Sequence, residues 1–301
     1  MIRSKQLILV LVMTLAISLA AVSAAMCYTT GMVGQWKMDE GSGTYIADSS
    51  PNGNHGTLLD PLDRTTWIAA PTGVGLQFDP GTADGEYDPN PNPYISVSNS
   101  GQFAHAGGFT VMAWMNIGSY GWDTYSGYGH TIISQGLVNS QPDGWMLKRR
   151  GGTSKQMAFR VGGTRLTTDT NLAHDTWYHI TGTFDAGTGA VALYVHNADG
   201  SLWINKSGSA SGIINNLDDL NIARLEPNYD NPPSYYQTGW GACPNKDCQG
   251  FWRGGLADVR YYDHALQYSD IQSIVPEPSS MLALATGFAG MAGFALRRRR
   301  R

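Results

Sequence analysis

Aromatic side chains gather in two segments of the sequence that are rich in Gly or Pro, and they could bind sugars. Trp122 and Tyr125 lie in the first segment, and Tyr235 and Trp240 lie in the second. The C–H faces of a pyranose ring pack on Trp or Tyr, while nearby Asp and Asn hydrogen-bond its hydroxyl groups. The same aromatic residues can instead pin a long loop to its own scaffold, and the sequence favours neither role.

Two cysteines beside the second aromatic segment predict a disulfide. Cys243 and Cys248 occur in the motif CPNKDC, which can close a small loop in an oxidising compartment. A metal site would need more soft ligands than this segment offers. Cys27 is left over and lies beside a predicted processing site.

Residues 1–25 have the three zones of a secretory signal peptide. Arg3 and Lys5 give a positive start, residues 7–21 form an almost unbroken apolar run, and small residues follow. The pattern predicts cleavage after Ala24 or Ala25 and export of the remaining chain.

The last part of the chain, residues 275–301, combines a short motif with an apolar segment and a basic end. Pro276, Glu277 and Pro278 precede 18 uncharged residues, 279–296, and five arginines follow them. Eighteen helical residues span about 27 Å, enough to cross a hydrocarbon core. The arginines are expected to stay on the cytoplasmic side.

This order of motif, apolar segment and arginines resembles the PEP-CTERM sorting signal of bacteria. The resemblance implies a transient anchor in the inner membrane and cleavage near the motif by an exosortase-type protease. It further implies delivery to the cell surface or the extracellular matrix. The motif is a tag that the protease reads and not a catalytic site of this protein.

The charge of the region between the two ends argues against a nucleic-acid partner. The sequence has 24 acidic residues, all at or after Asp39, and residues 26–296 hold 13 Lys and Arg, so this region carries a charge near −11. Phosphate binding needs clustered positive charge. Asp greatly outnumbers Glu, which suits turns and calcium ligation better than helices.

The elements that must position these residues are short strands separated by turn residues, with one short helix expected at 269–274. This pattern predicts an all-β protein built as an antiparallel sandwich or jelly roll. Trp36, Trp114 and Trp177 lie within strands and are predicted to pack in the core or on a sheet. Four segments alternate apolar residues at a spacing of two: 32–39, with Met32, Gly34, Trp36 and Met38 on one face; 109–117; a hairpin of 178–184 and 191–195; and 257–261, with Ala257, Val259 and Tyr261 in one row.

Four segments together resemble a laminin-G-like domain of the concanavalin A-like lectin/glucanase superfamily. They are 34–56, which begins with GQWKMDEGSG and ends with PNGNHG; 107–115; 177–195; and 255–271, with GLADVRYY. The resemblance implies one domain over residues 26–274, built as a jelly-roll sandwich of two antiparallel sheets. Departures at 118–130, 196–200 and 227–250 are particular to this chain, so loop-borne specificity does not transfer from relatives.

The resemblance also implies a structural calcium ion near the place where the first and last strands meet. By motif position, its ligands here are Asp39 and Asp258. Calcium takes six to eight oxygens, so two carboxylates form only part of a shell, and both could instead accept ordinary hydrogen bonds or face water. Asp48, with Asn52 and Asn54, is predicted to form a hydrogen-bonded turn.

Catalysis has little support in the sequence. Glucanases of this superfamily use two glutamates close together on one strand, and retaining hydrolysis needs its carboxyl pair about 5 Å apart. Glu40 and Glu86 are far apart in sequence, and prolines follow Glu86 closely. The histidines show no metal-ligand spacing, and there is no nucleophile elbow.

These observations predict an exported, non-catalytic, lectin-like protein of the surface or matrix that contacts polysaccharide. The alternative is a structural or adhesive matrix protein that uses the same sandwich for protein contacts. A glycoside hydrolase is the third reading.

Overall fold

Apolar side chains alternate between the two faces of the long central strand β7 (Gly108–Ile117). Its odd-numbered side chains, from Phe109 to Ile117, lie in the main core, as the spacing predicts. Met112 and Trp114 point to the opposite face and belong to a second cluster. Because both faces of β7 are covered, the strand is buried along nearly its whole length.

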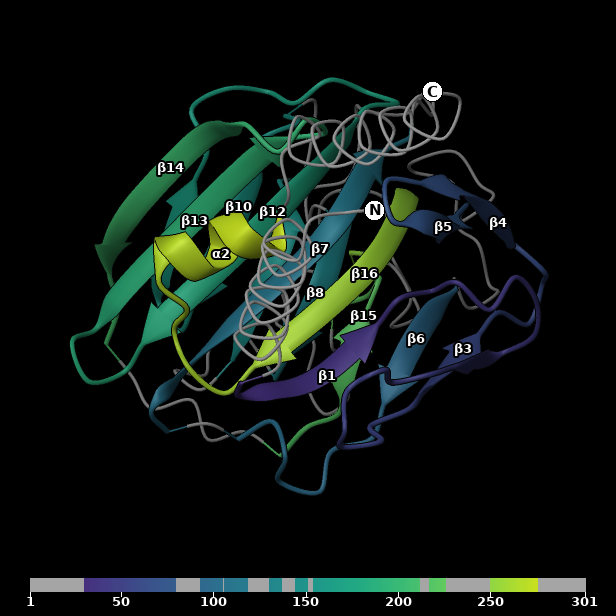
Figure 1. The fold of residues 1–301 in the computed structure, drawn as a ribbon, viewed down its shortest axis with the longest axis horizontal. Helices are drawn as coiled ribbons and strands as arrows, with labels where there is room; N and C mark the ends of the chain where they lie inside the picture. The colour runs from purple at the N-terminus through teal and green to yellow at the C-terminus, as the bar shows by residue number, and fades with distance from the viewer. Residues whose placement is uncertain are drawn as a thin grey trace, which may run out of the picture.

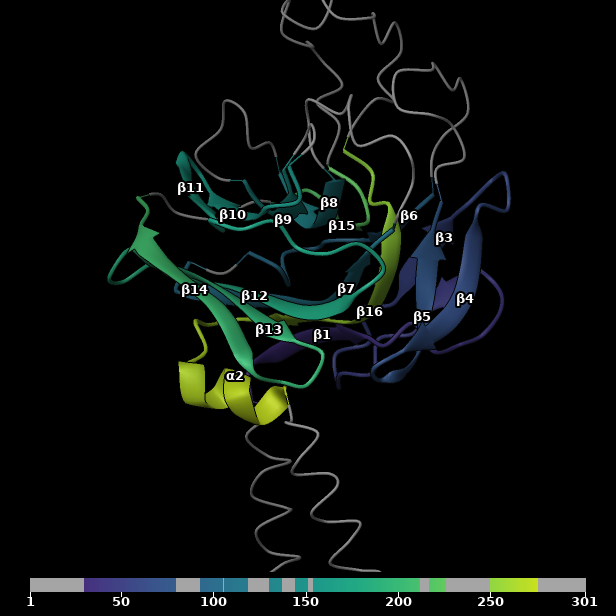
Figure 2. The same cartoon turned by 90° about the horizontal axis from the view of Figure 1, so that it is seen from above.

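The computed structural model describes residues 30–79, 93–104, 106–118, 130–136, 144–150, 154–211, 217–225 and 250–275. Within these residues two antiparallel sheets pack face to face, which confirms the predicted jelly-roll sandwich (Figure 1; Figure 2). Sheet A has the order β14 (Leu202–Ser209), β13 (Ala190–Asn197), β12 (Trp177–Asp185), β7, β16 (Gly254–Tyr262), β5 (Gly73–Phe78) and β4 (Thr65–Ala70), with β1 (Met32–Trp36) paired to β16. Sheet B has the order β11 (Thr164–Thr167), β10 (Met157–Val161), β9 (Trp145–Arg149), β8 (His130–Gln135), β15 (Leu220–Ile222), β6 (Tyr94–Val97), β3 (Gly56–Leu59) and β2 (Tyr45–Ile46).

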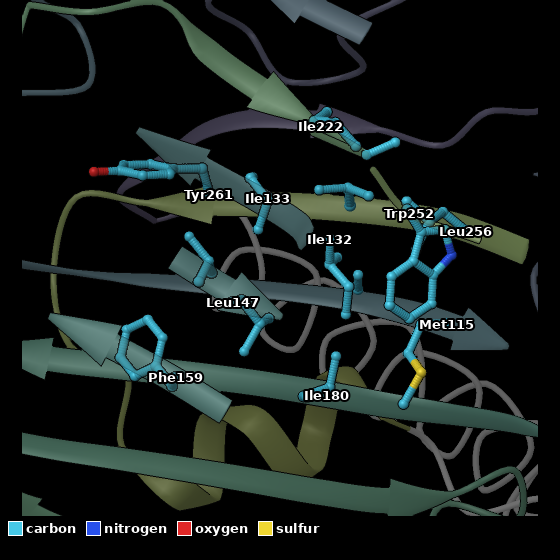
Figure 3. Packing of buried hydrophobic residues seen from close by; sticks show 14 of the residues in the cluster. Met115, Ile132, Ile133, Leu147, Phe159, Ile180, Ile222, Trp252, Leu256 and Tyr261 are labelled. Atoms are coloured by element: carbon cyan, nitrogen blue, oxygen red, sulfur yellow. The ribbon is translucent and has the colours of Figure 1, made fainter. Parts of the chain in front are cut away.

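The main core fills the space between the two sheets with side chains from both. Figure 3 shows Leu147 and Phe159 of sheet B and Ile180 and Tyr261 of sheet A within the same cluster. The Tyr261 ring stacks on Phe109, with centroids 5.8 Å apart, and lies 5.7 Å from the ring of Trp145. Aromatic contacts therefore join the sheets at their centre.

Strand β16 departs from the predicted alternation. Asp258 has a left-handed φ of 49°, and the pairing with β7 shifts between Ala257 and Arg260. This bulge puts Ala257 in the second cluster, whereas Val259 and Tyr261 lie in the main core. The prediction of a single row was wrong, because an extra residue reverses the side on which later side chains point.

The first strand shows a similar departure. β1 is shorter than the predicted segment 32–39, and its pairing with β16 shifts between Met32 and Gly34. Met32 therefore joins the second cluster, whereas Trp36 and Met38 lie in the main core. The prediction that all four alternate residues share one face was wrong at Met32.

The predicted turn around Asp48 is confirmed. The buried Asp48 carboxylate accepts hydrogen bonds from the backbone N–H groups of Gln35, Ser50 and Asn54 at 2.7–2.8 Å. The side-chain amides of Asn52 and Asn54 donate to the carbonyl of Val33. This network fastens the loop to strand β1.

Helix α2 (Tyr268–Ile274) covers the face of sheet A that points away from sheet B (Figure 2). Its Ile271 and Ile274 pack with Trp114 in the second cluster. The Tyr268 ring stacks on His196 of β13 at 6.1 Å, with an angle of 7° between the planes. The predicted short helix is therefore present, and it begins one residue earlier than expected.

Two buried histidines lie in this layer beneath α2. His196 is buried, and neither ring nitrogen has a hydrogen-bond partner among the described residues. Burial lowers the pKa of His196 to about 4. Burial, the neighbouring His196 and Arg260 lower the pKa of His179 in the same direction.

These pKa shifts predict loss of stability in acid. A histidine whose pKa is lowered by folding contributes stability that is complete above the unfolded value near 6.5 and is lost as the pH falls toward 4. His196→Phe keeps an aromatic ring against Tyr268 and cannot take up a proton. The free energy of unfolding, measured between pH 7.5 and 4.5, should therefore fall less in this variant than in the wild type. Equal falls in both would contradict the assignment to His196.

Candidate ligand-binding site

The ends of the two long aromatic segments meet at one rim of the sandwich. The backbone N–H of Gly118, just before residues 119–129, donates to the carbonyl of Arg253 at 3.3 Å. The N–H of Thr131, just after them, donates to the carbonyl of Gly250 at 2.7 Å. Since Gly250 and Arg253 follow residues 226–249, the structure joins the stems of segments about 100 residues apart in sequence.

Buried side chains hold these stems in place. His130 Nδ1 lies 2.9 Å from the carbonyl oxygen of Phe251, and because a carbonyl only accepts, this nitrogen carries the proton. The N–H of Trp252 donates to the carbonyl of Ala223 at 2.8 Å, which closes the base of the second segment. The Trp252 side chain is buried in the main core (Figure 3). Both segments therefore leave from a fixed base.

Tyr94, at the start of β6, lies at the same rim. The Arg224 guanidinium carbon lies 4.3 Å from the centroid of the Tyr94 ring and 5.6 Å from that of Phe251. Such cation–π contacts are favourable, and more so when desolvated. No local sequence pattern marks these three residues, because they lie in different segments of the chain.

We call this rim, formed by Tyr94, Gly118, His130, Arg224 and residues 250–253, the loop rim. The predicted sugar-contacting residues Trp122, Tyr125, Tyr235 and Trp240 lie outside the described residues, as do Cys243 and Cys248. The structure therefore places the stems of their segments together and leaves their own roles as predictions. Pro276, Glu277 and Pro278 also lie outside the described residues.

The predicted calcium ligand Asp258 lies at the bulge of β16. Along one edge of β16, the residues before this bulge pair with β5 and the residues after it pair with β1. The Asp258 carboxylate accepts from Gln35 Nε2 at 2.7 Å and from Arg260 Nη2 at 2.6 Å. Its backbone N–H donates to the carbonyl of Lys37 at 3.2 Å. Asp39 is therefore two residues along the chain from a residue that contacts Asp258 directly. Asp39 itself is exposed.

These contacts bear on whether a calcium ion fits. A buried carboxylate that is bonded to a guanidinium has fewer lone pairs to offer a cation. Among the described residues, no group of three or more His, Cys, Asp and Glu is placed to hold a metal ion. Although burial alone would lower it, the pKa of Arg260 is raised by the Asp258 carboxylate. Calcium binding through Asp39 and Asp258 stays a prediction.

Replacing Asp258 distinguishes a structural role of its carboxylate from a role in binding a metal ion. Both partners of the ion pair are largely buried, with 16% of the Arg260 side chain and 7% of the Asp258 side chain exposed. Asp258→Ala leaves the guanidinium without its carboxylate, and the expected loss of stability is about 3–5 kcal/mol. The measurement is denaturant unfolding in excess chelator, where calcium plays no part. A loss that appears only when calcium is present would contradict the structural role.

Asp39→Ala is the matched control, because its side chain is exposed and its replacement should change stability by less than about 0.5 kcal/mol in chelator. If Asp39 does bind calcium, saturating calcium should raise the Tm of the wild type and not that of this variant. Calcium at 100 times its Kd would add about 2.7 kcal/mol.

The tryptophans predicted to pack within strands do so. Trp36 is fully buried in the main core, and its Nε1 donates to the carbonyl of Asn54 at 2.8 Å. Trp114 is buried beneath α2, with its ring 5.2 Å from that of His179. Trp177 is half-buried against the same second cluster.

Comparison with known families places the chain in one of them. Residues 88–272 match the family described as the concanavalin A-like lectin/glucanases superfamily, which covers more than half of the sequence. The chain belongs to this superfamily, and the predicted resemblance is confirmed. The comparison with curated proteins gave no match.

Two solved structures are similar to parts of this chain. A mutant of Trypanosoma rangeli sialidase with trans-sialidase activity matches 82% of this chain and 33% of its own, at 16% identity and a TM-score of 0.51. A putative carbohydrate binding protein from Bacteroides ovatus matches 59% of this chain and 43% of its own, at 19% identity and a TM-score of 0.40. The chain spans about a third of the length of the sialidase, and at such low identity the likeness shows the fold alone.

Residues 275–300 match the PEP-CTERM protein-sorting motif, which confirms the predicted sorting signal. The match identifies an exported protein that is sorted to the cell surface. Within the described part of the chain, no helix is both long enough and apolar enough to span a membrane.

Proposed function

We propose that this protein is a non-catalytic, lectin-like protein of the cell surface or extracellular matrix, and that its loop rim binds polysaccharide. The observation that carries the proposal is the set of hydrogen bonds that joins Gly118 to Arg253 and Thr131 to Gly250. These bonds bring the bases of the two aromatic segments to one place. Sequence alone left those segments unrelated.

A fixed base favours binding for a physical reason. Ordering a loop when a ligand arrives costs free energy, and this cost falls when the ends of the loop are already held. The rim stems are tied to the core through Trp252 and His130, both buried. Aromatic residues carried on such stems would offer flat apolar faces to a sugar, with polar neighbours to hydrogen-bond its hydroxyls.

The binding role of the aromatic residues is tested by Trp122→Ala and Trp240→Ala. If both rings stack on a sugar, each replacement should weaken binding by about 1–3 kcal/mol, since a large apolar contact is lost. The Tm should change little, because neither ring would hold the sandwich together. The measurements are a glycan array, then calorimetric titration of the best glycan, beside thermal unfolding of each variant.

Two further tryptophans serve as controls for these variants. Trp203→Ala removes an exposed Trp from β14, three strands from β7, and should leave affinity unchanged. Trp114→Ala removes a buried Trp and should lower stability by about 3–5 kcal/mol. Unfolding of the Trp122 and Trp240 variants, without selective glycan binding by the parent, would assign both rings to loop packing. Self-association without glycan binding would favour a structural matrix protein, and released sugar products would favour a hydrolase.

We further propose that both ends of the chain are removed during export. The sequence predicts signal-peptide cleavage near Ala24, and the sorting motif supports cleavage by an exosortase-type protease near Glu277 after transient anchoring in the inner membrane. Mass spectrometry of the exported protein should find a start at residue 25 or 26 and an end near residues 276–278. Recovery of Arg297 to Arg301 in the surface fraction would contradict this, because the arginines should stay behind with the membrane helix.

A further inference from the structure

Helix α2 is followed by the sorting motif without a spacer. Val275, the residue after α2, is 1% exposed, and its backbone N–H donates to the carbonyl of Ile271 at 3.0 Å. Pro276, the first residue of the motif, comes next in the sequence. The match to the protein-sorting motif itself begins at residue 275. The residue that precedes the motif is therefore fixed in the fold.

Apolar contacts hold α2 on the face of sheet A that points away from sheet B (Figure 2). Ile271, Ile274 and Val275 are buried in the second cluster. The same cluster contains Trp114 of β7. Gln272, on the other side of the helix, is exposed. One apolar stripe therefore fastens the helix to the sheet.

The chain just before α2 is fixed separately. The buried hydroxyl of Thr110 in β7 donates to the carbonyl of His264 at 2.8 Å and accepts from the backbone N–H of Leu266 at 2.9 Å. The Leu266 side chain is itself buried. Because these contacts do not involve α2, the helix can leave the sheet while the connection before it stays in place.

A buried histidine under α2 favours release of the helix. The His196 ring lies 6.1 Å from the ring of Tyr268, and neither of its nitrogens has a hydrogen-bond partner among the described residues. A buried polar group without a partner costs free energy, which is recovered when water reaches it. Detachment of α2 takes the Tyr268 ring away from this imidazole. The apolar stripe that holds the helix is therefore opposed by an unsatisfied side chain.

After detachment the segment would be an extended chain. Seven residues are too few to form a stable helix in water. When extended, residues 268–275 span about 26–29 Å. Extended peptides are bound through their main-chain N–H and C=O groups, and the N–H of Val275 is already used within the docked helix.

We propose that α2 controls processing of the sorting signal, and that the exosortase-type protease cleaves near Glu277 only after α2 has detached from sheet A. The inference rests on the proposed removal of the C-terminal signal. While α2 is docked, the folded domain extends to the residue before the motif. A protease that holds the chain on both sides of the cleaved bond then meets the domain on one side. Detachment frees residues 268–275 for this contact.

The rate of processing should follow the detached population, as holds when opening and closing are fast relative to cleavage. Ile271→Ala shortens a fully buried side chain of α2 and should raise the rate about tenfold or more. His196→Phe keeps a ring against Tyr268 without burying a polar atom, and it should lower the rate about fivefold. The measurement is pulse labelling of cells that produce the full chain and an exosortase-type protease, with loss of the C-terminal residues followed by mass.

Two variants are matched controls for these changes. Gln272→Ala alters an exposed residue of the same helix and should leave the rate unchanged. Leu220→Ala shortens a fully buried side chain of sheet B, so it should lower the stability of the domain and leave the rate unchanged. Hydrogen exchange of the Ile271 variant should be faster only around residues 268–275, which distinguishes detachment of α2 from failure to fold.

Insertion of a spacer between Val275 and Pro276 is the sharpest test. Six Gly and Ser residues span about 20 Å when extended, so the protease can reach the motif while α2 stays docked. Processing of the spacer variant should be faster than that of the wild type. It should also no longer respond to Ile271→Ala or His196→Phe.

Two outcomes would overturn the role of α2 and leave the proposed processing in place. One is an equal rate for the wild type, Ile271→Ala and His196→Phe. The other is a spacer variant that is processed no faster than the wild type. Retention of residues 276–301 on every variant, the wild type included, would overturn both the proposed processing and this inference.

Discussion

The contact of Tyr261 with Phe109 and Trp145 is the interaction on which the rest of the structure depends. It joins the central strands of sheet A to sheet B, and the Tyr261 hydroxyl donates to the carbonyl of Phe103 at 3.1 Å. Burial, with a smaller effect of Asp263, raises the pKa of this hydroxyl, so it stays protonated and able to donate. Two twisted sheets can share one dry core only where such large side chains interlock.

Strand β16 connects this core contact to the loop rim, where ligand binding is proposed. One of its edges pairs with β7, and the other pairs with β5 and then β1 on either side of the Asp258 bulge. The residues just before it, 250–253, form part of the loop rim. The same strand therefore closes the sandwich and holds the stems of both aromatic segments, so damage to the bulge is expected to reach the rim as well.

The region between the two end signals carries a charge near −11. An acidic surface keeps a secreted protein soluble and repels polyanions at long range, and salt screens that effect beyond about 8–10 Å.

The sequence by itself determined the sorting signal, the all-β class and most of the core, because these depend on local order and on a spacing of two. The rows at 109–117 and in the hairpin β12–β13 were predictable for that reason, as was the turn at Asp48. Only the tertiary structure decided which way Met32 and Ala257 point, since a bulge arises from pairing with another strand. It also decided that residues 118 and 250–253 meet, because hydrogen bonds between distant segments leave no periodic trace in the sequence. The pairing of Asp258 with Arg260 and Gln35 was hidden for the same reason.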